Sequence, residues 1–169
     1  MQTTLLSVEE YLASHYRPDC DYVDGELEER NVGERDHSFV QAALIKYFAP
    51  LEQSLRLHVF PELRVRVGPK RFRVPDICVV LGDFPSEQVL TQPPFLCVEI
   101  LSPSDTLDRL QERIDDYLAM GVLCVWLLNP RTRRGWVYTG EGSREAKDGI
   151  LHTANPDLAV PLAALFPAD

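Results

Sequence analysis

The sequence predicts an α/β fold with a mixed sheet, and two observations support this prediction. The stretch 95–101 reads as an apolar strand, 107–120 has the apolar spacing of a helix, and 122–128 is again fully apolar. A strand, a helix and a strand at this spacing form a right-handed crossover, which makes the two strands parallel. Upstream, alternating and apolar runs between residues 57 and 81 predict a β-meander, in which neighbouring strands are antiparallel. Parallel and antiparallel strands together indicate a mixed sheet.

The composition suits one globular unit. The 169 residues are 45% hydrophobic and 25% charged, which suffices for one core, so we expect a single domain over residues 1–169. The first residues show neither the basic n-region nor the long apolar core of a signal peptide, and no apolar run approaches about 18 residues. We therefore expect a cytoplasmic protein with no membrane-spanning segment. The four cysteines lack the paired spacing of zinc sites, and we interpret them as small buried thiols.

The net charge limits how the chain can contact nucleic acid. A charge of −9 excludes a protein that coats nucleic acid by bulk attraction, because phosphate binding relies on Lys and Arg. Basic residues nevertheless crowd the stretches 64–73 and 131–134. Each cluster is either a solvated hairpin tip or a local basic surface, and the sequence leaves both interpretations open.

The N-terminal region carries signals for a helix and a hairpin. Ser7 and Glu10 have the spacing of a capping box, which predicts a short helix that ends near His15. Asp24-Gly25 favours a tight turn within a hairpin over 22–29, because both residues accept positive φ. The glutamates of that hairpin are interpreted as edge-strand residues, and a site role for one of them stays open.

Other signals place the remaining elements. Apolar spacing predicts a helix over 38–51 that Pro50 ends or bends. Gly121 is placed to end the helix that begins after Ser104, because glycine adopts the left-handed cap conformation. Further strands are expected at 136–138 and near Ile150.

Two strand-like runs each carry one acidic residue. Glu99 lies inside the apolar run 95–101, and Asp76 opens the run 77–81 after Pro75. A lone ionised carboxylate in a buried strand is costly unless it is paired, hydrogen-bonded or ligating a cation. We therefore expect the two acids to converge on one site. Mg²⁺ suits such a site, because it binds one or two carboxylates together with water and substrate phosphate. A buried ion-pair network is the alternative.

Two more residues are candidates for accessory roles. His37 lies at the start of the helix predicted over 38–51, where a histidine either caps the helix or contacts substrate. Glu62 follows Pro61 and opens the strand before the Asp76 run, so its carboxylate can join the same edge.

The order of these features resembles one nuclease family. A hairpin, a helix, a meander and Pro75-Asp76 are followed by Val98-Glu99-Ile100-Leu101-Ser102-Pro103-Ser104, a helix and Val125-Trp126-Leu127-Leu128-Asn129-Pro130. From about Val8 to Phe166 this order is similar to the bacterial Uma-two family of restriction endonucleases, a branch of the PD-(D/E)XK superfamily. The resemblance implies a restriction-endonuclease-like mixed central sheet flanked by helices, with an N-terminal helix and hairpin. It also implies that Asp76 and Glu99 bind Mg²⁺.

The chain departs from the superfamily pattern at its basic residue. The motif expects Lys two residues after Glu99, where this chain has Leu101. In this family the Lys often comes from the next helix, four residues before a Tyr, and here that position is Arg113, before Tyr117. Arg keeps the charge but presents a planar fork and gives up a proton poorly. We expect Arg113 to act as the transition-state cation; an exposed residue paired with a neighbouring acid is the alternative.

The sequence thus predicts a Mg²⁺-dependent endonuclease that cleaves DNA phosphodiester bonds, with Mn²⁺ as an alternative ion and RNA as an alternative substrate. Its catalytic residues are Asp76, Glu99 and Arg113, with His37 and Glu62 as accessory groups. A catalytically inactive module that uses the fold to bind DNA or protein is the competing hypothesis. We expect a two-fold homodimer, because cutting both DNA strands usually needs two active sites. A chain of charge −9 also attracts DNA weakly unless basic segments from two subunits flank a common groove.

Overall fold

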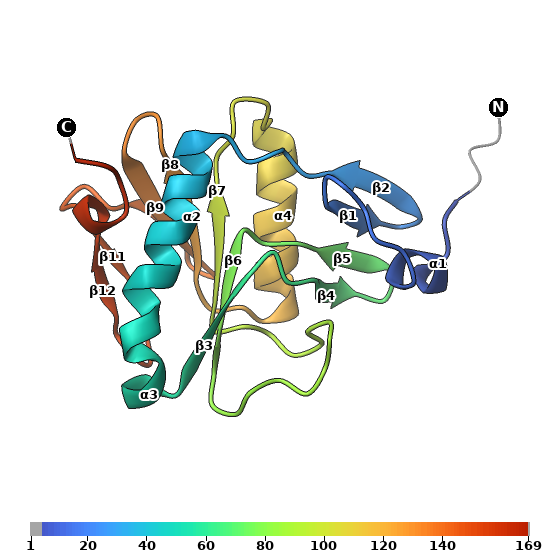
Figure 1. The fold of residues 1–169 in the computed structure, drawn as a ribbon, viewed down its shortest axis with the longest axis horizontal. Coiled ribbons are helices and arrows are strands. Elements are labelled where there is room, and N and C mark those ends of the chain that lie inside the picture. Colours follow the sequence, from blue (N-terminus) through green and yellow to red (C-terminus); the bar gives the residue numbers. More distant parts are fainter. Residues whose placement is uncertain (1–4, 169) are drawn as a thin grey trace.

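A six-stranded mixed sheet forms the centre of the computed structural model, which describes residues 5–168 (Figure 1). Its strand order is β10-β9-β8-β7-β6-β3. Strands β7 and β8 are parallel, and every other neighbouring pair is antiparallel. The predicted mixed sheet and crossover are therefore confirmed. The strands are β3 (Leu57–Pro61), β6 (Ile77–Leu81), β7 (Leu96–Ile100), β8 (Val125–Asn129), β9 (Arg134–Thr139) and β10 (Gly142–Glu145).

Helices α2 (Arg35–Phe48) and α4 (Leu107–Met120) cover opposite faces of this sheet (Figure 1). Alternation along β7 sets the two faces: Leu96, Val98 and Ile100 pack in the core cluster that contains α2 residues, whereas Cys97 packs in the cluster that contains α4 residues. Glu99 has the same parity as Cys97. The acid of β7 therefore points toward α4.

Helix ends follow the local signals in the sequence. Thr106 caps α4 by accepting a hydrogen bond from the Arg109 N–H, and Gly121 ends it at φ 110°, as predicted. Helix α2 begins three residues before the predicted start, and Pro50 lies in the short 3₁₀ helix η1 (Ala49–Leu51) that follows it. One further turn, α3 (Glu52–Leu55), leads into β3.

The predicted meander is only partly right: β4 (Val65–Gly68) and β5 (Arg71–Arg73) pair antiparallel across the 68–71 turn as expected, but the strands divide between two sheets. Strands β4 and β5 join β1 (Cys20–Val23) and β2 (Glu26–Glu29) in a separate sheet of order β2-β1-β5-β4. Strand β3 then pairs directly with β6. The chain changes sheet at Glu62, which has φ 52°, and changes back at 74–76, where Pro75 offers no N–H to a ladder.

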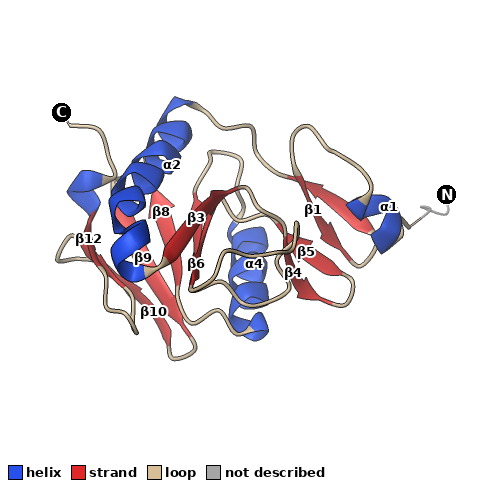
Figure 2. Cartoon of the chain, turned by 60° about the horizontal axis from the view of Figure 1, so that its bottom comes forward, coloured by secondary structure: helices blue, strands red, loops and turns tan. Residues whose placement is uncertain are grey.

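The two smaller parts of the fold lie at opposite ends of the molecule (Figures 1 and 2). On the N-terminal side, α1 (Val8–Leu12) starts at the predicted capping box of Ser7 and Glu10, and the hairpin turns at Asp24-Gly25 with φ values of 51° and 102°. On the C-terminal side, β11 (Ile150–His152) and β12 (Ala159–Pro161) form a two-stranded sheet before η2 (Leu162–Ala164).

Two composition-based expectations can be compared with the structure. All four cysteines are buried free thiols, as predicted. Among the described helices, none is long and apolar enough to cross a membrane.

Candidate active site

Strand register brings the two predicted acids together. In the antiparallel pair β6 and β7, Ile77 faces Val98 and Cys78 faces Cys97. Continuing this register by one residue places Asp76 opposite Glu99. Residues directly opposite each other in an antiparallel pair project to the same face. The two acids therefore lie side by side: Glu99 contacts Tyr117 of α4, and Asp76, at the end of the ladder, contacts His37 of α2.

A single arginine nitrogen joins the two carboxylates. Arg30 Nη2 donates to Asp76 Oδ1 at 3.1 Å and to Glu99 Oε2 at 2.9 Å. Arg30 follows β2, in the connection that leads to α2. The predicted convergence of Asp76 and Glu99 is thus present, and a cationic side chain lies between them.

Asp76 is held ionised by several donors. Its Oδ2 accepts from the Ile100 N–H at 2.6 Å, and its Oδ1 lies 3.2 Å from His37 Nε2. Burial alone would raise the pKa of Asp76, but the charge of Arg30, then His37 and the Ile100 N–H, outweigh it and hold that pKa below its usual value. Burial alone would lower the pKa of His37. The hydrogen bond and the charge of Asp76 outweigh burial, and the pKa of His37 is therefore raised above its usual value.

Glu99 is more deeply enclosed. Its side chain is 1% exposed, and its Oε1 accepts from the Tyr117 hydroxyl at 2.7 Å. Burial raises the pKa of Glu99, and Arg30 and Arg113 oppose that rise without cancelling it. Asp76 and Glu99 thus differ in how firmly each holds its negative charge, because His37 and the Ile100 N–H also lower the pKa of Asp76, whereas the charge of Asp76 raises that of Glu99.

Arg113 faces the site from α4. Its Nε lies 3.2 Å from Glu99 Oε2, and its Nη2 donates to Asp105 Oδ1 at 3.1 Å. The residue is 7% exposed. The alternative of an exposed helix residue paired with a surface acid is therefore excluded. Arg113 thus links an ion pair with Glu99 to a hydrogen bond with Asp105, which restrains Glu99 relative to the loop that carries Asp105.

The two accessory candidates differ in how closely they approach Asp76. His37 is buried and contacts the Asp76 carboxylate directly. Glu62 is exposed, and its Oε1 accepts from Gln41 Nε2 at 3.3 Å, while the same nitrogen donates to the Asp76 backbone carbonyl at 3.0 Å. Gln41 thus links Glu62 to the site from α2.

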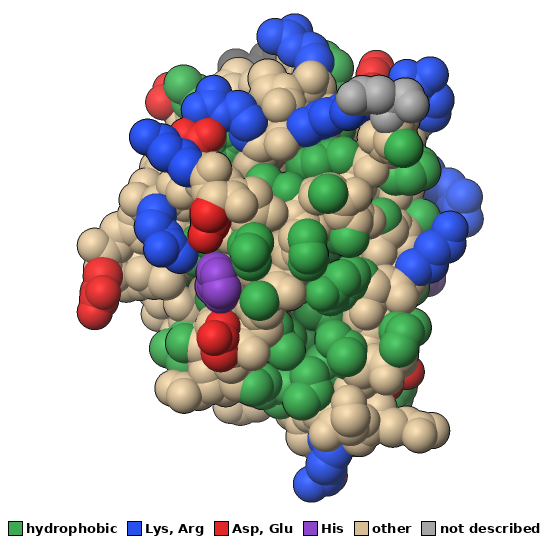
Figure 3. Space-filling view, turned by 90° about the vertical axis from the view of Figure 1, so that its left-hand side faces the viewer, with side chains coloured by type: hydrophobic (Ala, Val, Ile, Leu, Met, Phe, Trp, Pro, Cys, Tyr) green, Lys and Arg blue, Asp and Glu red, His purple; other side chains and the backbone are tan. Residues whose placement is uncertain are grey.

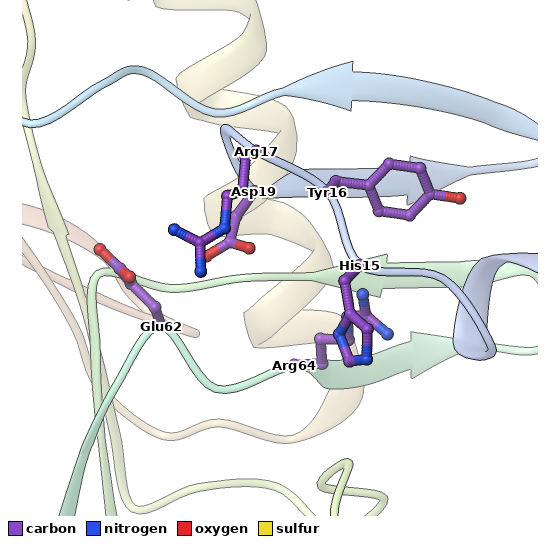
Figure 4. Close-up of a pocket in the computed structure, with 6 residues that line it drawn as sticks. All are labelled: His15, Tyr16, Arg17, Asp19, Glu62 and Arg64. Atoms are coloured by element: carbon purple, nitrogen blue, oxygen red, sulfur yellow. The ribbon is translucent and has the colours of Figure 1, made fainter.

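A pocket of about 460 Å³ opens onto Asp76, Arg30 and His37. It shares Arg17, Asp19 and Glu62 with a second pocket of about 350 Å³, so the two form one groove. Figure 4 shows the outer pocket: Glu62 lies on one side, Arg17 and Asp19 at the centre, and His15 and Arg64 on the other side. This groove gives a ligand a path to Asp76.

A second ion network lies beside the acids and accounts for one basic cluster. Arg73 is fully buried; it donates to Asp21 at 3.1 Å, to Glu28 at 2.8 Å and to Asp116 at 2.7 Å. The cluster 64–73 is therefore only partly a basic surface: Arg73 is internal and Arg71 pairs with Asp24 and Asp116, whereas Arg66 and Lys70 are exposed. The sequence left open whether a glutamate of the hairpin only solubilises an edge strand or takes part in a site. Glu28 belongs to the Arg73 network.

The donor set suits a hard divalent cation. Among residues 5–168 no group of three or more His, Cys, Asp or Glu side chains is placed to hold a metal ion. Mg²⁺ needs only one or two carboxylates when water and substrate phosphate complete its shell. The Arg30 guanidinium shows that a positive charge is accommodated between Asp76 and Glu99. The two carboxylates therefore fit such an ion once that position is vacated.

Comparison with known proteins identifies the family. A model of the Uma2 family, described as "Putative restriction endonuclease", matches residues 8–165. The chain belongs to the Uma2 family. Membership of this family supports the assignment of the chain as a nuclease.

The fold is similar to that of a solved structure described as "a putative nuclease belonging to DUF820 from Anabaena variabilis ATCC 29413". It is 19% identical and has a TM-score of 0.80, with 95% of this chain and 97% of that chain covered. At this identity the likeness shows the fold alone. A search of curated proteins found no match.

Sequence reasoning missed two residues of the site. Tyr117 served in the sequence to locate Arg113 and not as a site residue, although the spacing of four between them places both on one face of the helix. Arg30 gave no local signal, because it follows a glutamate-rich edge strand and its partners are 46 and 69 residues away.

Proposed function

We propose that this Uma2 chain is a Mg²⁺-dependent endonuclease that cleaves DNA phosphodiester bonds, with Mn²⁺ able to replace Mg²⁺. The observation that carries the proposal is the convergence of Asp76 and Glu99 on one cationic group at the end of a groove. When bound there, the metal would polarise a phosphodiester and activate water. The chain's own residues supply the rest of the site.

Those residues act by holding charge in place. Asp76 and Glu99 would ligate the ion, and the Ile100 N–H and the Tyr117 hydroxyl fix the oxygen atoms that face away from it. Arg113 would restrain Glu99 and place positive charge beside the reacting phosphate. His37 would orient Asp76 through their contact, and Glu62 would line the entrance.

Metal binding and cleavage test this proposal together. Mn²⁺ titration followed by electron paramagnetic resonance should show binding that Asp76→Asn or Glu99→Gln weakens strongly. Nicking of a supercoiled plasmid should require Mg²⁺ or Mn²⁺ and be lost in both variants, whereas RNA should be cut less. Asp115→Asn is the matched control, because Asp115 is an exposed acid of α4 that accepts from Gln111. Binding and cleavage indifferent to both site variants would refute the assignment.

One observation favours a second candidate, an inactive module that keeps the fold to bind DNA or protein. Both acids already have basic partners in Arg30, Arg113 and His37, so the site is electrostatically complete without a metal. Absence of Mn²⁺ binding, with DNA affinity retained in Asp76→Asn, would favour this module over the nuclease.

We further propose that two copies form a homodimer. Figure 3 shows hydrophobic side chains gathered over the middle of one face, with charged side chains mainly at its margins. Phe39, an exposed residue of α2, lines an apolar pocket with Ala42, Ala43 and Tyr47. Two such faces would bury apolar area against each other and provide two active sites.

A further inference from the structure

Arg30 occupies the position that a metal ion would need. Its Nη2 is the atom that contacts both Asp76 and Glu99. A divalent cation bound by the same two oxygen atoms cannot coexist with a guanidinium nitrogen at that point, because the two positive charges would compete for the same lone pairs. Either the arginine or the ion can hold the two carboxylates at one time.

The arrangement also lets Arg30 leave this position. Arg30 belongs to the connection between β2 and α2, and it lines the 460 Å³ pocket together with Asn31, Val32 and Gly33. Its Nη1 is buried with no hydrogen-bond partner in the described part of the chain, and it lies 4.0 Å from Asp21 Oδ2. The guanidinium is therefore incompletely hydrogen-bonded where it lies between the acids, and the pocket that the residue lines offers it a second position.

We propose that Arg30 and a divalent cation exchange places, and that the displaced guanidinium turns into the pocket to bind the substrate phosphate that the ion also contacts. In the metal-free protein Arg30 neutralises Asp76 and Glu99. After exchange, its planar fork can donate two hydrogen bonds to one phosphate group. The inference rests on the proposed function, since it assumes that a metal and a phosphodiester bind at this site.

The exchange makes two predictions of opposite sign for Arg30→Gln. Without the resident cation, Mn²⁺ alone should bind more tightly, by roughly tenfold or more, because the ion no longer has to displace a guanidinium. A DNA oligonucleotide should bind more weakly in the presence of Ca²⁺, because one phosphate contact is lost. A purely structural role for Arg30 would instead weaken both.

Arg17→Gln is the matched control. Arg17 is an exposed residue of the same pocket, so its replacement removes the same charge without vacating the position between the acids. Mn²⁺ affinity should rise far less in Arg17→Gln than in Arg30→Gln. Equal gains in the two variants would mean that general electrostatics, and not exchange, explain the effect, and would overturn the inference.

Side-chain NMR of wild-type protein labelled with ¹⁵N-arginine keeps the inference testable if Arg30→Gln does not fold. Addition of Mg²⁺ should shift the Nε–H signal of Arg30, assigned by its absence in Arg30→Lys. A wild-type protein that binds Mg²⁺ through Asp76 and Glu99 while this signal stays in place would overturn the exchange and leave the proposed nuclease intact. Failure of every variant and of the wild type to bind Mn²⁺ would instead reject the proposed function.

Discussion

Replacing Tyr117 with Phe tests whether Glu99 is ionised inside the protein. The substitution removes only the hydroxyl that donates to Glu99 Oε1 at 2.7 Å. Tyr117 is 0% exposed and Glu99 1% exposed, so water cannot readily replace the lost donor. A hydrogen bond to a charged group contributes about 1.5–3 kcal/mol, against about 0.5–1.5 kcal/mol for a neutral pair. We therefore expect a loss of about 1.5–3 kcal/mol in the free energy of unfolding at pH 8.

The chain supplies its own reference for this measurement. Tyr11 is also 0% exposed, and its hydroxyl donates to the backbone carbonyl of Cys20 at 2.8 Å, a neutral acceptor. Urea unfolding of wild type, Tyr117→Phe and Tyr11→Phe should show the larger loss of unfolding free energy in Tyr117→Phe. The m-value, the dependence of this free energy on urea concentration, should be the same in all three proteins. For a chain of this size each kcal/mol lowers the melting temperature by about 2–4 °C. If Tyr117→Phe costs no more than Tyr11→Phe, the charged pairing of Glu99 inferred here is wrong.

Four further predictions concern Arg113, Gly135 and Phe39. Arg113→Ala should cost roughly 3 kcal/mol in unfolding measurements, since Glu99 keeps Arg30 while Asp105 loses a partner, and an unchanged stability would contradict the buried ion pairs. Arg113→Lys should retain most of that stability and raise any Mg²⁺-dependent cleavage rate, whereas equal rates in wild type, Arg113→Lys and Arg113→Ala would remove this residue from the mechanism. Gly135→Ala should destabilise by about 1–3 kcal/mol, because its Cβ would lie 2.9–3.1 Å from three leucine methyl groups; a variant as stable as wild type would mean that the core adjusts freely. Light scattering should give a dimer mass at micromolar concentration that Phe39→Glu reduces toward the monomer, and a monomer mass for the wild type would reject the homodimer.

Local sequence signals predicted most of the fold because each has a local physical cause. The capping box at Ser7, the turn at Asp24-Gly25 and the stop at Gly121 each depend on the conformations of a few adjacent residues. The parallel pairing of β7 and β8 follows from the length and handedness of one crossover. Sheet membership is different, because β4 and β5 satisfy a strand pattern equally well in either sheet. Only the partners contributed by the N-terminal hairpin decide the outcome.

The candidate site shows the same division. Asp76 and Glu99 were recognisable because an acid in an apolar strand needs a partner, and their strands adjoin. Arg30 was not recognisable, because its role depends on a hairpin that folds back over a sheet formed by residues much later in the chain. Arg113 was placed correctly beside Glu99, but its burial was not expected, and its loss should now affect stability as well as activity.

The buried network around Arg73 has a consequence for how the chain folds. Arg73 bonds to a residue 52 positions earlier and to another 43 positions later, so its charge is compensated only when the N-terminal hairpin and α4 are both in place. A chain that docked only one of them would bury a guanidinium with half of its partners, which is unfavourable. The small sheet and the second half of the protein should therefore form in one cooperative step. Such dependence on distant contacts favours slow folding, and it means that α4 must be synthesised before the N-terminal hairpin can settle.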